Sequence, residues 1–266
     1  MGVIKKYFKT QFRFQMFMLK DEDVSDFYLS AFQKNRSTVP LFFIRLIISF
    51  GCIGTLIASA MTITDFGYWP IFLTHWGLVL NAIAAVLGVI VSARAYLRGP
   101  IEAIFGLPWY VKMYWVMTNI ATTIALFITV FYWSFLTDLD EDYAPNEILD
   151  VFIHLVNSIL MLALLLSARQ PMRLLHFYQP LVVGIIYMIF SIIYYFAGGT
   201  NPWTNDPYIY PPLDWSTPGT AVVTVLISMF LITILNAVCA ALVVGRDTLG
   251  RCCRKDNEYP ISIGNY

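Results

Sequence analysis

The chain has 266 residues, of which 58% are hydrophobic and 13% are charged, and its 17 Lys and Arg residues balance its 17 Asp and Glu residues. A mean hydropathy of +0.67 is too high for a soluble domain of this length. These values exclude a soluble globular enzyme and indicate one integral membrane domain.

Residues 1–39 precede the first long apolar run and are predicted to form a cytosolic N-terminal segment. They contain no apolar core followed by a small-residue cleavage site, so we expect no removable signal peptide. Basic and apolar side chains recur every four residues here, at Lys5, Lys9 and Arg13 and at Phe8, Phe12 and Met16. Two interpretations remain open: a short helix in the inner headgroup layer, or a basic tail without fixed structure.

Six apolar segments, each 17 to 24 residues long, lie at 41–61, 71–91, 115–135, 151–168, 181–197 and 221–244. As an α-helix rising about 1.5 Å per residue, each can cross a hydrocarbon core about 30 Å thick. Backbone polar groups in lipid must be hydrogen-bonded within their own segment, which favours helices. We therefore predict an all-α membrane protein in which residues 40–245 form a bundle of six transmembrane helices.

The distribution of basic residues predicts the orientation of this bundle. If the N-terminus is cytosolic, all Lys and Arg residues lie on the cytosolic side, and the opposite loops contain acidic residues only. This count includes Arg45, inside the first segment, as a side chain that snorkels to the headgroups. Basic residues resist translocation, so we expect both termini, including the tail 246–266, to be cytosolic.

The four cysteines indicate no external disulfide, because Cys52 and Cys239 lie within predicted spans and none lies in an outer loop. Cys252 and Cys253 follow the last span and are flanked by basic residues. A thiol at headgroup depth on the cytosolic side is typical of lipidation by S-palmitoylation. These two cysteines are therefore either palmitoylated or an unmodified pair.

Two outer loops differ in chemistry. Residues 138–142 are mainly acidic and are interpreted as a solvated loop. Residues 198–218 contain five prolines and the aromatic residues Trp203, Tyr208, Tyr210 and Trp215. This loop either lies on the outer membrane surface as an aromatic belt, or folds over the bundle as a lid or a surface for a membrane-protein partner. Membrane lipids are the other expected partner, and no nucleic-acid binding is indicated.

Few ionisable residues lie inside the spans, and several of them share one region. Asp150, His154 and Asn157 are spaced i, i+4 and i+7, which predicts that they share one helix face. Thr74, which adjoins His75, is predicted to lie at the depth of His154. Nucleophilic catalysis requires a hydroxyl, an imidazole and a carboxylate in contact, so the candidate catalytic residues are Thr74, His154, His75 and Asp150. The alternative is that these groups only hydrogen-bond between packed helices.

Three deeper polar residues, Asn81, Asn119 and Asn236, are interpreted as hydrogen-bonding groups between helices rather than a transport path. The chain contains no P-loop, no zinc-ligand spacing and no dinucleotide-binding fingerprint. We therefore expect neither a cofactor nor a metal ion.

About half of the chain resembles the rolling stone family of multi-pass membrane proteins. The stretches that carry this resemblance are Tyr-Trp-Ser at 132–134, His-Leu-Val-Asn-Ser at 154–158, Pro-Met-Arg-Leu-Leu-His-Phe-Tyr at 171–178, Ile-Tyr-Tyr-Phe-Ala-Gly-Gly-Thr at 193–200 and Tyr-Ile-Tyr-Pro-Pro-Leu-Asp-Trp at 208–215. The resemblance implies a protein of the plasma membrane that acts in cell–cell fusion, as described for insect myoblasts, or in muscle development. The endoplasmic reticulum is the alternative location.

The bundle is more distantly similar to the androgen-induced membrane hydrolases, which cleave fatty acid esters of hydroxy fatty acids with an intramembrane Thr and His. Phe-Leu-Thr at 72–74 matches the surroundings of their threonine, and His-Leu-Val-Asn at 154–157 matches their His-x-x-His pattern. Asn157 thus replaces the histidine that is catalytic in that family, and an amide cannot act as a general base. Either His154 or His75 takes over this role, or the chemistry is absent. The replacement favours a fusion protein without hydrolase activity, and the alternative is an intramembrane threonine-type lipid-ester hydrolase.

Overall fold

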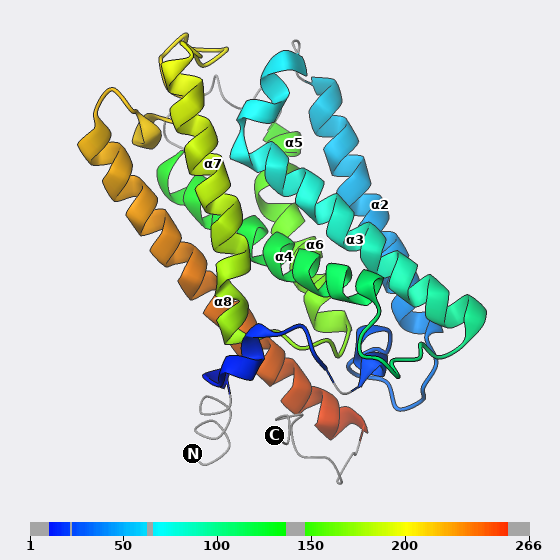
Figure 1. Cartoon of the computed structure of the whole chain (residues 1–266). Coiled ribbons are helices and arrows are strands. Elements are labelled where there is room, and N and C mark those ends of the chain that lie inside the picture. The colour runs from blue at the N-terminus through cyan, green and yellow to red at the C-terminus, as the bar shows by residue number, and fades with distance from the viewer. Residues whose placement is uncertain (1–10, 22, 63–65, 137–146, 255–266) are drawn as a thin grey trace.

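The structure is a computed structural model that describes residues 11–21, 23–62, 66–136 and 147–254. Within these residues the chain forms seven α-helices and no β-strand, and six helical segments are long and apolar enough to cross a membrane. They are α2 (Val39–Thr62), α3 (Leu73–Arg98), α4 (Trp109–Phe135), the segment Glu147–Ser167, α7 (Tyr178–Phe196) with the turn before it, and α8 (Pro218–Arg254) (Figure 1). Each corresponds to one predicted apolar segment, so the predicted six-helix bundle is confirmed.

The fourth span is not a continuous α-helix. A π turn at Phe152–Val156 joins α5 (Glu147–Val151) to α6 (Asn157–Ser167). A π turn has i→i+5 hydrogen bonds and takes up one residue more than an α-helical turn. Side chains that follow it are therefore rotated relative to those that precede it.

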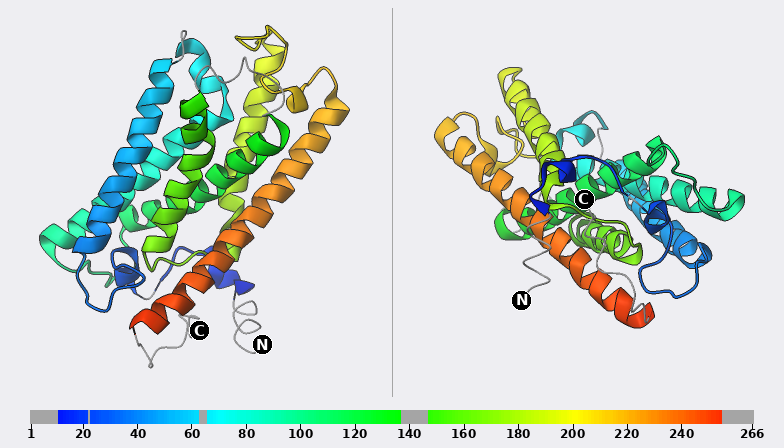
Figure 2. Two further views of the ribbon diagram at one scale, coloured as in Figure 1. Left: turned by 180° about the vertical axis from the view of Figure 1, so that it is seen from behind. Right: turned by 60° about the horizontal axis from the view of Figure 1, so that its bottom comes forward.

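Helix α4 occupies the centre of the bundle and is the most buried span. It packs against α3 and α6 and, on another side, against α7 and α8 (Figure 2). Helix α2 packs against α3 and α6. Short 3-10 turns precede or link the helices at Phe14–Phe17, Val24–Phe27, Phe66–Ile71, Leu174–Phe177 and Pro211–Leu213. Both ends of the described chain lie at the same end of the bundle, as an even number of spans requires (Figure 1).

Arg45 does not snorkel to the headgroups, so that expectation was wrong. Its side chain is fully buried, and the guanidinium donates hydrogen bonds to the Ser92 hydroxyl (2.6 Å), the Tyr114 phenol (2.7 Å) and the Gly88 carbonyl (3.1 Å). These oxygens from α3 and α4 replace water and headgroups as partners of the charge. Arg45 therefore links α2, α3 and α4 inside the bundle.

Asn119 and Asn236 form the predicted hydrogen bond between helices. The Asn236 amide of α8 donates to Asn119 Oδ1 of α4 (3.1 Å), and the Asn119 amide donates to Gln179 Oε1 of α7 (2.9 Å). Three helices thus meet at one buried polar cluster. Asn81 is also buried, but its side-chain oxygen has no hydrogen-bond partner within the described part of the chain.

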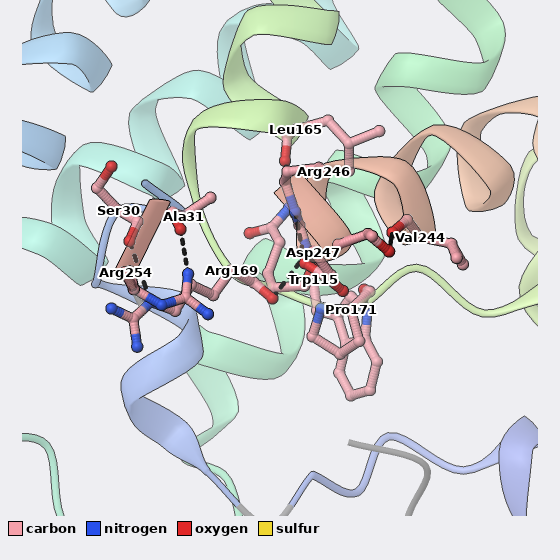
Figure 3. A network of polar contacts seen from close by, with 12 residues as sticks. Ser30, Ala31, Trp115, Leu165, Arg169, Pro171, Val244, Arg246, Asp247 and Arg254 are labelled. Atoms are coloured by element: carbon pink, nitrogen blue, oxygen red, sulfur yellow. Dashed lines mark hydrogen bonds and ion pairs between the residues drawn. The ribbon is translucent and has the colours of Figure 1, made fainter. Parts of the chain in front are cut away.

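Arginine side chains connect the helix ends at the side of the bundle where the termini lie (Figure 3). Arg246 of α8 donates to three carbonyls in and just after the last turn of α6, those of Leu165, Arg169 and Gln170. Carbonyls at a helix C-terminus have no partners within their own helix, and a cation there also complements the helix dipole. Arg169 donates to the Ser30 carbonyl and Arg254 to the Ala31 carbonyl, which attaches the N-terminal segment to the same network.

The predicted N-terminal helix can be assessed only in part, because Lys5, Phe8 and Lys9 lie outside the described residues. The described portion forms a 3-10 turn at Phe14–Phe17, preceded by an exposed Phe12. The acidic loop at 138–142 also lies outside the described residues.

Candidate active site

Thr74, His154 and Asp150 meet near the end of the bundle opposite the termini. The Thr74 hydroxyl lies 3.4 Å from Nε2 of His154, and Nδ1 of His154 lies 2.8 Å from Asp150 Oδ1. Thr74 is the second residue of α3, Asp150 lies in α5, and His154 lies in the π turn. The carboxylate favours a hydrogen on Nδ1, which leaves the lone pair of Nε2 facing the hydroxyl. This is the geometry of a nucleophile, a general base and a carboxylate that orients the base.

Tyr132 of α4 is a site residue that the sequence reasoning missed. Its ring is stacked parallel to the His154 imidazole with 3.5 Å between ring centroids, and its phenol donates to Asp150 Oδ2 (2.8 Å). The stack restricts rotation of the imidazole, and the hydrogen bond orients the carboxylate. Tyr132 belongs to a stretch that carries the family resemblance, but its contact with residues 18 and 22 positions later follows only from the packing of two helices.

The π turn around His154 is supported by α4. Thr129 donates to the backbone oxygen of His154 (2.5 Å), and its hydroxyl lies 2.5 Å from the Ser158 hydroxyl. Irregular helical turns interrupt the normal hydrogen-bond ladder and frequently occur at functional sites. The threonine gives the carbonyl in this turn a partner and positions His154 relative to α4.

His75 makes different contacts from His154, although it adjoins Thr74 in sequence. Its Nδ1 lies 2.5 Å from the backbone oxygen of Trp69, and its ring is stacked on the Trp69 ring at 4.5 Å between centroids. The hydrogen bond of the Thr74 hydroxyl to an imidazole is the one with His154. Within the described residues, no group of three His, Cys, Asp or Glu side chains is arranged to bind a metal ion.

Asn157 does not extend the polar face of Asp150 and His154. Its buried side chain donates to the Ile153 carbonyl of its own helix (3.2 Å). The π turn lies between Asp150 and Asn157 and rotates Asn157 by roughly a quarter turn relative to a continuous α-helix. The predicted shared face is therefore correct for Asp150 and His154 and wrong for Asn157.

A largely apolar cavity begins at this site and extends between α4, α7 and α8. Its outline encloses about 790 Å³, part of which is solvent at its open side, and the centre of a water-sized sphere can move through about 90 Å³ of it. Thr74 and Tyr132 line it, so the nucleophile candidate and the ring that stacks on His154 both face it. The walls are mainly hydrophobic, with Ile124, Phe127, Ile128, Phe131, Met188, Val225, Met229 and Ile232 among them. A hydrophobic cavity with a few polar groups at one place is typical of a ligand-binding site.

The loop 198–218 covers this end of the bundle, which corresponds to the lid position considered above. Ile209 is buried in a cluster with Ile71 and Phe72, and Trp203 stacks on Phe72 at 5.0 Å. Next to Ile209, the Tyr210 phenol lies within hydrogen-bonding reach of the Thr74 side chain and of the backbone at the start of α3. Burial raises the pKa of Tyr210 to about 12, so it remains a protonated hydrogen-bond donor at neutral pH.

The family model described as protein rolling stone matches residues 2–255 of the chain. The chain belongs to the rolling stone family. Protein rolling stone of Drosophila melanogaster is 28% identical to it over 210 residues, which are 74% of this chain and 74% of that protein. No solved structure matches the chain. The resemblance to the rolling stone family is therefore confirmed, and the chain is a multi-pass membrane protein of that family.

Proposed function

We propose that this rolling stone family protein is an intramembrane hydrolase of lipid esters, with Thr74 as the nucleophile. The proposal departs from the expectation that the replacement of a histidine by Asn157 removes this chemistry. The observation that supports it is the contact of the Thr74 hydroxyl with His154 Nε2, at 3.4 Å, while Asp150 holds the other ring nitrogen. Because the nucleophile faces an apolar cavity, an acyl chain can lie beside it.

In the proposed reaction, His154 Nε2 takes the proton of the Thr74 hydroxyl as its oxygen attacks the ester carbonyl. The Tyr210 phenol, close to Thr74, is placed to donate to the oxygen that becomes negatively charged. The alcohol leaves with the proton from His154, and the acyl group remains on Thr74. Water, deprotonated by His154, then hydrolyses the acyl-threonine to a fatty acid and restores the hydroxyl.

The test is fatty acid release by the purified protein from a palmitate ester of hydroxystearic acid or of glycerol, in detergent micelles. We expect wild type and Thr74→Ser to release fatty acid, because both carry a hydroxyl. Thr74→Val keeps the side-chain shape without the hydroxyl and should lose activity by at least about 100-fold, as should His154→Gln. Unchanged thermal unfolding of the variants is the control. Absence of turnover in well-folded wild type, or turnover that persists in Thr74→Val, would refute the hydrolase.

We further propose that the protein acts at the plasma membrane in cell–cell fusion or muscle development, and that the loop 198–218 contacts a membrane-protein partner. Membership of the rolling stone family supports this role. Deleting the gene in muscle precursor cells that express it should reduce the number of nuclei per fused cell. Wild type and Thr74→Val are then re-expressed in the deleted cells. If fusion depends on the hydrolase reaction, only wild type should restore it, and if it does not, both should restore it. Normal fusion after deletion would contradict the role.

A further inference from the structure

The polar groups that line the cavity are uncharged. Within the described residues they are the hydroxyl groups of Thr74, Tyr132, Tyr187, Tyr210, Thr224 and Ser228. A hydroxyl can donate to or accept from an ester, an alcohol or an amide. None of these groups neutralises a carboxylate or a phosphate, which when buried requires a paired charge.

The surroundings of the cavity add negative charge and no positive charge. The sequence contains no Lys or Arg in 46–93, 113–168 or 174–245. These ranges include every residue that lines the cavity and the described loops 66–72 and 197–217 at that end of the bundle. Asp150 hydrogen-bonds to Tyr132, which is part of the cavity wall. An anionic group on a ligand would approach this carboxylate without any cation to offset the repulsion. The charged guanidinium of Arg45 is already engaged by Ser92 and Tyr114.

We infer that the cavity takes acyl esters without an anionic group, such as monoacylglycerols and long-chain alcohol esters, and discriminates against esters that carry a free carboxylate or a phosphate. The inference rests on the function proposed above, since it specifies the substrate class of the same site. It also separates this chain from the androgen-induced hydrolases that it resembles, whose substrates carry a free carboxylate. Discrimination arises from the missing cation and the nearby Asp150. The phenols of Tyr132 and Tyr187 already donate to Asp150 and to the Ile71 carbonyl, so the other hydroxyl groups of the lining orient the ester.

A matched pair of esters tests the inference. One is the palmitate ester of hydroxystearic acid, and the other is the palmitate ester of the secondary alcohol in which a methyl group replaces the carboxylate. Binding is measured on Thr74→Val, which cannot turn either compound over, by displacement of a monoacylglycerol with a nitrobenzoxadiazole group on its acyl chain. At neutral pH, we expect the uncharged ester to displace the probe at a concentration at least 10-fold lower than the carboxylate requires.

Leu213, in the 3-10 turn that closes one side of the cavity, offers a complementary variant. Leu213→Arg in the Thr74→Val background should reduce the difference between the two esters, because it supplies the missing cation. Leu213→Gln is the uncharged control of similar size and should leave the difference unchanged. Equal displacement by both esters, preference for the carboxylate, or failure of the probe to bind would overturn the inference. Selective binding together with no turnover by wild type would instead refute the hydrolase and leave the charge selectivity supported.

Discussion

Asp150 accepts hydrogen bonds from two rings at once, with Oδ1 facing His154 and Oδ2 facing Tyr132. The two rings are also stacked on each other. The orientation of the imidazole is thereby constrained by a carboxylate at its edge and an aromatic face beside it. Asp150 does not line the cavity, so it positions the imidazole without touching the substrate, and its role can be separated from that of Thr74.

We predict that Asp150→Asn lowers ester turnover by about 10²- to 10⁴-fold, because an amide can stabilise the wrong imidazole tautomer. Tyr132→Phe retains the stacked ring and loses only one hydrogen bond, so its loss should be smaller, about 10-fold. Initial rates over a range of pH, measured on both variants, check the prediction. Equal losses of turnover in the two variants would contradict the prediction, because they would show that Asp150 does not orient the imidazole of His154.

A second residue-scale prediction concerns pH and Asp26, in the N-terminal segment. Burial and the neighbouring Asp23 and Asp21 raise the pKa of Asp26 from 3.8 to about 8. The folded protein therefore keeps this proton while the unfolded chain loses it near pH 4. The stability that this group contributes is complete below pH 3.8 and is lost as the pH rises to about 8. Asp26→Asn cannot ionise, so it should unfold at a higher temperature than wild type at pH 8, with a smaller difference at pH 5. A difference that grows toward low pH would contradict this prediction.

Among the helices, the fourth span is irregular at the place where it contributes to the candidate site. The π turn supplies His154, while α5 supplies Asp150 and α6 begins at Asn157. The neighbouring α4 contributes Thr129 and Tyr132 to the same region. An irregular turn on one helix is thus stabilised by side chains of the next, which keeps the polar groups of the turn satisfied within the membrane.

Close packing of α2, α3 and α4 depends on Gly88. A Cβ added at Gly88 would lie 3.0 Å from the Tyr114 ring and 3.5 Å from the Arg45 side chain, whereas one added at Gly54 of α2 would meet nothing within 4 Å. We predict that Gly88→Val destabilises the bundle by about 1–3 kcal/mol through overpacking and displacement of Arg45. Gly54→Val is the matched control and should have a much smaller effect. Unfolding in mixed detergent micelles measures both, and equal destabilisation would show that helix propensity, not packing, determines the result.

In the whole molecule, one end of the bundle carries the arginine network and the other end carries the cavity and the candidate site. Helix α8 has 37 residues and, at about 1.5 Å per residue, is about 55 Å long. A hydrocarbon core about 30 Å thick cannot contain it, so the helix continues past the membrane. Its last turns carry Arg246 and Arg254 into the network of helix ends and the N-terminal segment. The start of α3, helix α5 and the 3-10 turn Pro211–Leu213, which contribute residues to the candidate triad or to the cavity, lie toward the opposite end (Figure 1).

For orientation, we predict that the end with the termini faces the cytosol. In a background that carries Cys252→Ser and Cys253→Ser, the exposed positions Thr204 and Phe105 are replaced singly by cysteine. An impermeant maleimide should label Thr204→Cys in intact cells and Phe105→Cys only after permeabilisation. The reverse pattern would invert the topology.

The exposed cysteines at the end of α8 lead to a further whole-molecule prediction. Acyl exchange should detect a thioester on wild type, and the signal should be lost in Cys252→Ser with Cys253→Ser. We expect this variant to be redistributed among membranes without a change in unfolding temperature, because the side chains lie beyond the packed bundle. Cys52→Ser, at a buried position within α2, is the control and should retain the thioester. A wild-type chain without thioester would exclude palmitoylation.

The six spans can be predicted from the sequence alone, because a run of apolar residues long enough to cross a bilayer is visible without knowledge of the tertiary structure. The sequence also determined the family, through short stretches between and within the spans, and the contact of Asp150 with His154, which lie one helical turn apart.

Which polar groups meet across helices follows only from the way the helices pack. The packing paired Thr74 with His154 rather than with the adjacent His75, and it enclosed Arg45 inside the bundle. The contribution of Tyr132 and the position of Tyr210 likewise depend on the packing of separate segments. Helical periodicity relates residues a few positions apart, but it contains no information on the rotation and depth of one helix relative to another. Even within one helix, a π turn changes that periodicity, which is why the predicted position of Asn157 was wrong.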